Sequence, residues 1–290
     1  MYDFIYSDKK NILKNTEKFI LFVKKLLPKY ANSLPDSAVI TLYREVKKLK
    51  KGKDKLIIET GVGASTIGLF LGAYMFKKKL YTFDINPDKI TLLRQVINDA
   101  ICRPLKININ DFWTYVPSNS LDKYTGIPAL AELKIKPQLV FLDSFHSMDH
   151  LKKEVIEFSK ISTKEFVIGM DDGNHTNSKI FPFGYTNMIR EKIGLKKIKN
   201  PKENISVSFF HGVNELLKKK YKSTKKIKTF YEKNFQNDLW FQYFGADIFY
   251  DGLTDRKNVD DFKHVNIFSK LNKKEKESFK SRIVFFSVKK

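Results

Sequence analysis

The order of apolar and polar residues predicts strands and helices that alternate along most of the chain. From residue 55 onward, short apolar runs are followed by longer amphipathic segments. The short runs predict five strands, at residues 56–60, 80–83, 104–109, 139–142 and 165–170. The amphipathic segments predict helices at residues 65–76, 87–100, 128–133 and 147–161. This alternation is typical of a doubly wound α/β fold, a mostly parallel sheet with helices on both faces.

The N-terminal part of the chain follows a different pattern. Residues 8–50 place apolar side chains at helical spacing and are interrupted by Pro28 and Pro35. This predicts two amphipathic helices. We interpret residues 1–50 as a helical cap that precedes a main domain at residues 51–290.

The C-terminal third is rich in lysine and aromatic residues. A lysine-rich insertion is expected near residues 192–233, and two aromatic segments, residues 239–250 and 282–288, each predict a strand. Within the insertion, residues 214–233 have two interpretations. They form either a surface for nucleic acid or an anionic substrate, or a solvated amphipathic helix that buries Leu216, Leu217, Tyr221, Ile227 and Phe230.

Composition limits the class of protein. The 290 residues are 42% hydrophobic and 14% aromatic, which is enough for a core and excludes disordered and fibrous chains. The single cysteine, Cys102, cannot form an internal disulfide, and acidic residues interrupt the N-terminus where a signal peptide needs an apolar run. These features predict a cytoplasmic protein. The nearly uncharged residues 56–76 contain four glycines and predict a buried strand, loop and helix in place of a membrane span.

The net charge of +22 first indicates a partner of opposite charge, such as nucleic acid, an anionic membrane or an acidic substrate. However, only six of the 54 basic residues are arginine. Recognition of phosphates and bases favours the planar fork of arginine. The charge alone therefore does not select nucleic acid.

A glycine turn after the first predicted strand is typical of a nucleotide cofactor site. Residues 59–65 read Glu-Thr-Gly-Val-Gly-Ala-Ser, so that Gly61 and Gly63 let a ligand lie against the main chain at the start of a helix. Ser65 is the third small position of this motif. Thr66 stands where the dinucleotide fingerprint requires glycine, and no Gly-Lys-Ser/Thr of a P-loop follows.

Two acidic elements further along the chain extend this site. Asp84 ends the second predicted strand, where a carboxylate can accept both hydroxyls of a ribose. Asp111 and Phe112 follow the third predicted strand, where a carboxylate and a ring could contact an adenine. The alternatives are that the glycines form an ordinary turn and that Asp84 caps the helix that begins at Pro87.

Three more carboxylates follow the fourth and fifth predicted strands. Asp143 ends one strand, and Asp171 and Asp172 end the other, at the edge where parallel sheets build their sites. Carboxylates this close together repel one another, and a hard cation such as Mg²⁺ between them is the simplest way to relieve the repulsion. In the alternative, Asp143 and Asp171 only cap the next helices. A zinc or iron site that uses His146 and His150, at i and i+4 of one helix, with His175 nearby, is a further alternative.

Together these motifs resemble the class I S-adenosylmethionine-dependent methyltransferases, over about residues 55–195. The segment Asp143-Ser144-Phe145-His146, followed by Asp171-Asp172, narrows the resemblance to the cephalosporin hydroxylase and rhamnosyl O-methyltransferase group. The resemblance implies a Rossmann-like sheet that is closed by a C-terminal antiparallel hairpin, with residues 240–247 beside residues 282–288.

The resemblance also implies roles for single residues. Glu59, Gly61 and Gly63 would surround the methionine part of the cofactor, with Asp84 on the ribose and Asp111 and Phe112 near the adenine. Asp143, Asp171 and Asp172 would hold Mg²⁺, which holds the acceptor hydroxyl, and His146 would be the general base. Phe145 departs from the pattern, because this position is usually acidic in the group.

The sequence thus predicts a metal-dependent O-methyltransferase that acts on a hydroxyl of a saccharide or another small molecule. An RNA methyltransferase, suggested by the charge, and a non-catalytic cofactor-binding protein are the alternatives. A homo-oligomer is compatible with the sequence.

Overall fold

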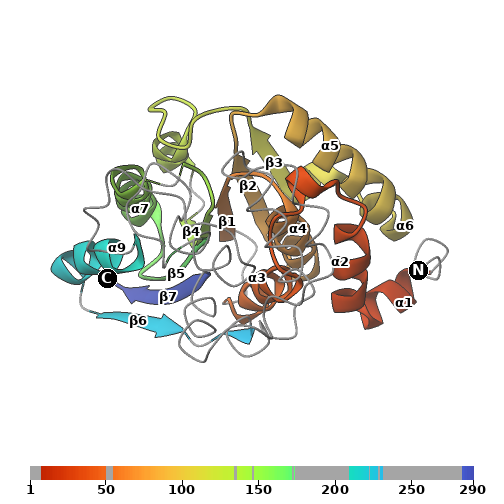
Figure 1. The fold of residues 1–290 in the computed structure, drawn as a ribbon, viewed down its shortest axis with the longest axis horizontal. Coiled ribbons are helices and arrows are strands. Elements are labelled where there is room, and N and C mark those ends of the chain that lie inside the picture. Colours follow the sequence, from red (N-terminus) through yellow and green to blue (C-terminus); the bar gives the residue numbers. More distant parts are fainter. Residues whose placement is uncertain are drawn as a thin grey trace, which may run out of the picture.

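The computed structural model describes residues 8–49, 55–133, 136–145, 147–171, 173, 209–221, 223–227, 229–230 and 283–290. Its centre is a seven-stranded sheet in the order β3-β2-β1-β4-β5-β7-β6 (Figure 1). The strands are β1 (Lys55–Thr60), β2 (Lys79–Phe83), β3 (Trp113–Val116), β4 (Lys136–Leu142), β5 (Glu165–Met170), β6 (Ser223–Ile227) and β7 (Val284–Lys289). The strands β1 to β5 pair in parallel, and β7 is antiparallel to both β5 and β6. This confirms the doubly wound, Rossmann-like α/β fold with a closing antiparallel pair.

Helices cover both faces of the sheet because its central strands are apolar on both sides. In β1, Ile57 belongs to one core cluster, whereas its neighbours Leu56 and Ile58 belong to the other, and all three are fully buried. The helices α4 (Ala64–Met75) and α5 (Pro87–Ile97) cover the first face. The helices α7 (Met148–Ile161) and α9 (Phe209–Lys220) cover the second. The predicted helix at residues 128–133 is a 3₁₀ helix, Ile127–Glu132.

The N-terminal segment packs on α4. The first of its two predicted helices is divided at Asn15 into α1 (Lys9–Lys14) and α2 (Thr16–Lys24). A 3₁₀ turn, Lys29–Ala31, leads to α3 (Asp36–Lys48). A Cβ at Gly68 would lie 2.5 Å from the Val39 carbonyl oxygen, so α3 and α4 touch through their main chains.

The third predicted strand, at residues 104–109, is wrong. Helical turns continue beyond α5 through Asn98–Cys102 and α6 (Arg103–Leu105), and a 3₁₀ turn, Ile109–Asp111, follows. Proline is well tolerated in the first turn of a helix, the position of Pro104 in α6, because the N–H groups there have no partner within the helix. Leu105 and Ile109 of this segment are buried as expected, but β3 begins only at Trp113.

The C-terminal sheet edge differs in part from the prediction. The strand predicted at residues 282–288 is found as β7, Val284–Lys289, and its described neighbours are β5 and β6; the expected partner at residues 240–247 lies outside the described residues. The strand predicted at residues 239–250 lies outside the described residues. Residues 214–227 form the end of α9 and then β6 in place of one continuous helix, and Leu217 is buried as the amphipathic interpretation requires.

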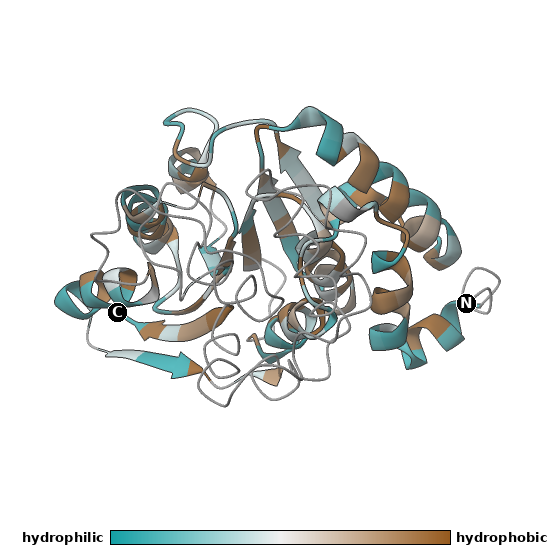
Figure 2. Ribbon diagram, in the orientation of Figure 1, coloured by the Kyte–Doolittle hydropathy of each residue, from teal (hydrophilic) through white to brown (hydrophobic). Residues whose placement is uncertain are grey.

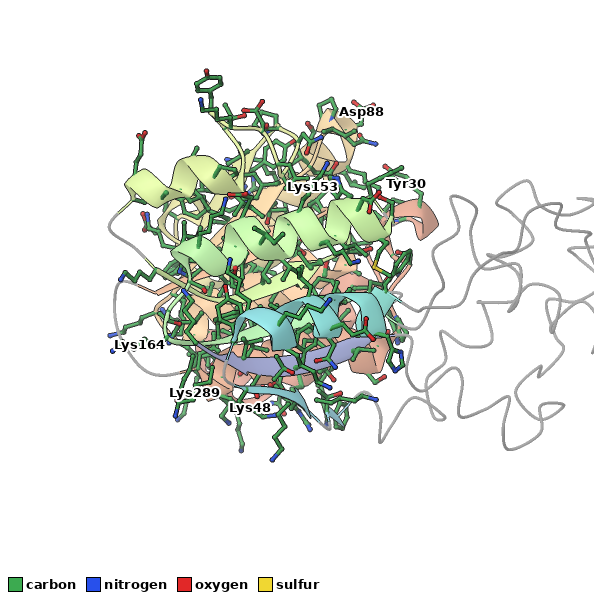
Figure 3. All side chains as sticks on the ribbon, turned by 90° about the vertical axis from the view of Figure 1, so that its left-hand side faces the viewer. Tyr30, Lys48, Asp88, Lys153, Lys164 and Lys289 are labelled. Atoms are coloured by element: carbon green, nitrogen blue, oxygen red, sulfur yellow. The ribbon has the colours of Figure 1, made fainter. Side chains whose placement is uncertain are left out.

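Lysines line the exposed rim of the sheet. Lys225 and Lys226 are exposed on the edge strand β6, which is mostly hydrophilic, whereas β7 beside it is mostly hydrophobic (Figure 2). Lys164 and Lys289 project from the same region of the surface (Figure 3). Charged residues on an edge strand oppose pairing with other chains. Among the described residues, no helix combines the length and apolar character needed to cross a bilayer.

We expect Gly68→Ala to lower the free energy of unfolding by about 1–3 kcal/mol, the usual cost of overpacking, because the new Cβ meets the rigid main chain of Val39. Gly212→Ala is the matched control on α9, since its Cβ meets only the flexible end of Met148. Both changes gain helix propensity, so the control should be nearly neutral. Thermal and urea unfolding measure both variants, and equal stability of the two would contradict the proposed packing.

Candidate functional site

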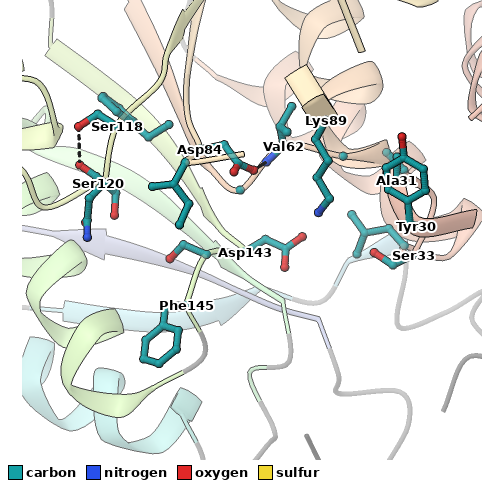
Figure 4. A pocket seen from close by; sticks show the side chains of 18 of the residues that line it. Tyr30, Ala31, Ser33, Val62, Asp84, Lys89, Ser118, Ser120, Asp143 and Phe145 are labelled. Carbon is teal, nitrogen blue, oxygen red and sulfur yellow. Dashed lines mark hydrogen bonds between the residues drawn. The ribbon is translucent and has the colours of Figure 1, made fainter. Parts of the chain in front are cut away.

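A pocket of about 350 Å³ opens at the carboxyl ends of β1 to β4 (Figure 4). The chain order of the strands reverses between β1 and β4, and doubly wound sheets bind ligands at such a point. The walls come from the turn after β1, the loops after β2, β3 and β4, and the helix α7. The cap supplies one more wall, made of Tyr30, Ala31, Ser33 and Leu34.

The glycine turn after β1 touches the end of β4. Gly61 has a φ of +86°, and a Cβ there would lie 1.9 Å from the Asp143 carbonyl oxygen. The Gly61 N–H donates to the Phe83 carbonyl at 2.8 Å, so the turn also holds the end of β2. Gly63 is the N-cap of α4, whose first turn opens into the pocket. Both glycines predicted to contact a cofactor therefore line the pocket, next to a helix N-terminus that favours negative or polar groups.

Asp84 lies directly beside this turn in the pocket wall. Its Oδ2 accepts from the Val62 N–H and its Oδ1 from the Asn86 N–H, both at 2.7 Å. The N-cap of α5 is Asn86, whose side chain accepts from Asp88 and Lys89, so the interpretation of Asp84 as the cap is wrong. A carboxylate has about four acceptor positions, and Asp84 keeps part of this capacity for a ligand in the pocket.

Glu59 and Ser65 lie beneath the turn and do not line the pocket. Glu59 is fully buried, and its carboxyl group accepts from Ser65 Oγ at 2.5 Å, Thr66 Oγ1 at 2.9 Å and Thr82 Oγ1 at 2.7 Å. Trp113 Nε1 in turn donates to Thr82 Oγ1. Both residues therefore support the turn from below, which differs from the direct contact with the cofactor that we expected of them.

The pKa of Glu59 is raised to about 8, mainly because burial removes the carboxylate from water. The three hydroxyl donors oppose this shift, and the negative charge of Asp143 adds to it. Glu59 is consequently largely protonated at neutral pH.

Asp111 and Phe112 lie at the amino end of β3, before the strand, and they do not line the pocket. Phe112 packs edge-on against Tyr74 of α4. Their expected position near an adenine depended on the strand at residues 104–109, which is absent. The loop that does follow β3 at the pocket contains Ser118, Asn119 and Ser120. The alternation of Trp113-Thr114-Tyr115-Val116, typical of a half-buried strand, is the signal that could have located it.

The structure brings two of the three predicted metal ligands to neighbouring strand ends. Leu142 pairs with Met170, and the next residues are Asp143 and Asp171. The Asp171 N–H donates to the Leu142 carbonyl at 2.9 Å. Asp143 lines the pocket, whereas Asp171 is only 3% exposed. Oxygen ligands of this kind suit a hard divalent ion.

Asp172, His146 and His175 lie outside the described residues. Within the described part of the chain, no three His, Cys, Asp or Glu side chains gather closely enough to hold a metal ion. Ser147 is the N-cap of α7, so the interpretation of Asp143 as that cap is wrong. The helix begins at Met148 and contains His150, one of the two residues of the zinc or iron alternative.

A second polar cluster in the pocket wall was not predicted. Glu154 of α7 is fully buried, and its Oε1 accepts from Ser120 Oγ at 2.5 Å and from Ser144 Oγ at 2.8 Å. His150 Nε2 lies 3.3 Å from the same oxygen. Ser120, Ser144 and His150 all line the pocket. The i, i+4 spacing of His150 and Glu154 is visible in the sequence, but the two serines come from separate loops that only the fold brings together.

The raised pKa of Glu59 predicts that stability depends on pH. The folded protein keeps the proton up to about pH 8, whereas the unfolded chain loses it near 4.5. The stability is therefore fully present below pH 4.5, and it falls between pH 4.5 and 8 by up to about 1.4 kcal/mol per pH unit. Glu59→Gln should remove this slope, because the amide stays neutral. Urea unfolding at several pH values tests this, and an unchanged slope in the variant would contradict a protonated Glu59.

No family model matches the chain, and no curated protein matches it in sequence.

Among solved structures, it is similar to an O-methyltransferase from Bacillus cereus in complex with SAH, with 19% identity over 73% of this chain and 83% of that chain and a TM-score of 0.47. It is similar to a TDP-rhamnose 3′-O-methyltransferase of calicheamicin biosynthesis, with 18% identity over 63% and 81% of the two chains and a TM-score of 0.41. It is also similar to an SAH-bound methyltransferase from Podospora anserina, with 14% identity over 72% and 81% and a TM-score of 0.41.

Proposed function

We propose that the protein is an S-adenosylmethionine-dependent O-methyltransferase that acts on a hydroxyl of a small molecule. The observation that carries this proposal is the Gly61 turn and Asp84, joined by the hydrogen bond from the Val62 N–H, side by side in the wall of one pocket at the switch point of the sheet. The volume of about 350 Å³ falls in the range of pockets that hold small ligands. When bound, the cofactor supplies an electrophilic methyl group on a sulfonium ion.

The residues present fit this cofactor. Asp84 has acceptor capacity left for the two ribose hydroxyls, and its hydrogen bond to Val62 fixes its orientation toward the turn. Ile85, 76% exposed at the pocket, offers an apolar surface for a base. The polar loop at Ser118–Ser120 lies beside it after β3 and supplies hydrogen-bonding groups.

A divalent ion, in our proposal Mg²⁺, would be held by Asp143, Asp171 and Asp172. The adjacent positions of Asp143 and Asp171 at the ends of β4 and β5 support this proposal. Such an ion lowers the pKa of a bound hydroxyl and neutralises its charge. His146 would then be the general base, as the resemblance implies.

A saccharide or another small hydroxylated molecule is the proposed acceptor. The cap closes part of the pocket with Tyr30 and Leu34, which favours a compact ligand. Phe145 is 63% exposed at the same pocket and adds an apolar surface. Methyl transfer would depend mainly on how the walls orient the acceptor oxygen toward the methyl group.

We expect isothermal titration to show binding of S-adenosylhomocysteine by the wild-type protein. Asp84→Asn should weaken this binding at least about tenfold, because one carboxylate oxygen that accepts a ribose hydroxyl is replaced by a donor. Asp88→Asn, on the exposed first turn of α5, is the matched control and should bind like the wild type. No binding by a folded wild-type protein would contradict the proposed function.

For the metal, we expect one Mn²⁺ per chain to bind in the presence of S-adenosylhomocysteine, measured by electron paramagnetic resonance with Mn²⁺ in place of Mg²⁺. Asp143→Asn should weaken Mn²⁺ binding at least about tenfold, since the site loses a charged oxygen ligand. Asp149→Asn, exposed on α7, should not change it. Equal Mn²⁺ binding by the Asp143 variant and the wild type would remove the metal from the proposal.

A further inference from the structure

In the described part of the chain, hydrogen-bond donors reach only one of the two oxygens of the buried Glu154 carboxyl group. Its Oε1 faces Ser120, Ser144 and His150, whereas its Oε2 is buried and has no hydrogen-bond partner among the described residues. A buried carboxylate in this state is costly unless a positive charge lies next to it. The His150 imidazole lies 3.3 Å from the other oxygen, Oε1, measured from its Nε2.

The same contact decides which nitrogen of His150 faces a ligand. In the neutral ring, Nε2 carries the hydrogen when it donates to Glu154 Oε1, and Nδ1 then keeps the lone pair. The ring is held in place by Glu154 at one edge and by Phe145, whose ring meets it edge-on at 5.9 Å between centroids. His150 also lines the pocket. Its Nδ1 is the nitrogen left for a hydroxyl that enters the pocket.

We propose that His150, in place of His146, accepts the proton of the acceptor hydroxyl during methyl transfer and that Glu154 is the residue that positions it. This inference rests on the proposed O-methyltransferase function. The acceptor O–H bond breaks and its proton passes to Nδ1, while the oxygen forms a bond to the methyl carbon. The electron pair of the methyl–sulfur bond stays on sulfur, so that S-adenosylhomocysteine, a methyl ether and an imidazolium paired with Glu154 are formed. Release of the proton to water restores the site.

The charges around the pocket agree with this role. Asp84 and Asp143 share its walls with His150, and Lys89 is the lysine that lines it. Ser120 and Ser144 tie Glu154 to the loops after β3 and β4, so the dyad is fixed relative to both walls. A purely structural role of the cluster would require the serine bonds to Glu154, but it would not require a histidine with a defined tautomer at the pocket surface.

The first test needs no acceptor. Nitrogen-15 NMR of protein labelled on histidine, saturated with S-adenosylhomocysteine, reports the tautomer, and His150→Gln identifies the signal. We expect the Nε2–H tautomer in the wild type and its loss in Glu154→Gln, while Glu157→Gln on the same helix leaves it unchanged. An Nδ1–H tautomer, or a wild-type pattern retained in Glu154→Gln, would overturn the inference.

The second test measures transfer of tritiated methyl groups to catechol and to TDP-rhamnose. We expect His150→Gln to lower kcat at least about 100-fold, as is typical for loss of a general base, with the dissociation constant of S-adenosylhomocysteine unchanged. Glu154→Gln should lower kcat about tenfold, and Lys153→Ala, exposed on α7, should behave like the wild type. Undiminished turnover by His150→Gln would overturn the inference.

The two proposals fail in different ways. A wild-type protein that binds no S-adenosylhomocysteine, or transfers no methyl group to any hydroxyl acceptor, contradicts the O-methyltransferase function. The tautomer of His150 is still measured in that case, and it decides whether Glu154 orients the ring. Turnover by the wild type together with an unaffected His150 variant contradicts only the role of His150.

Discussion

The site depends on one close contact, between the Gly61 turn and the main chain at Asp143. The Cα of any other residue at Gly61 would carry a Cβ into the Asp143 carbonyl oxygen, at 1.9 Å. The same turn donates a hydrogen bond to the end of β2 at Phe83. Three strand ends are thereby fixed to one another, and they carry the glycine turn, Asp84 and Asp143. A larger residue would separate these strand ends, and the walls of the pocket would move apart with them.

The polar network under the turn explains why the contact is rigid. The Glu59 carboxyl group accepts hydrogen bonds from three hydroxyl groups, in the first turn of α4 and in β2, and Trp113 of β3 extends the network. Buried hydrogen bonds of this kind are strong because water does not compete for them. The raised pKa keeps Glu59 largely protonated at neutral pH, so this support adds little negative charge beneath a pocket that already contains Asp84 and Asp143. The motif residues below the turn and those at its surface thus have separate functions.

The sequence predicted the elements whose apolar residues follow one clear pattern. It missed those whose structure depends on contacts with distant parts of the chain. Strands β1, β2, β4 and β5 are buried on both faces and read as short apolar runs, and the glycine turn follows from its position between β1 and α4. The segment at residues 104–109 alternates apolar and polar residues, as a half-buried strand does, but Leu105 and Ile109 are buried from helical turns, and periodicity over six residues cannot separate these cases. Because of this error, Asp111 and Phe112 were expected at the carboxyl end of the third strand, whereas they lie at the amino end of β3. Glu154 was missed for another reason, because its partners Ser120 and Ser144 lie in loops that only the parallel register brings to α7.

The distribution of charge connects the fold to the proposed chemistry. The chain has a net charge of +22, yet the pocket wall carries Asp84 and Asp143 against Lys89 and the ionisable His150. The lysines described on α9, β6 and β7 lie at the far edge of the sheet, where they keep an edge strand from pairing. A pocket with two carboxylates inside a basic protein attracts a cation more than the surface around it does. In the proposed reaction, the sulfonium ion of S-adenosylmethionine is such a cation and the thioether of its demethylated product is not, so the negative field of the pocket attracts the cofactor more strongly than the product.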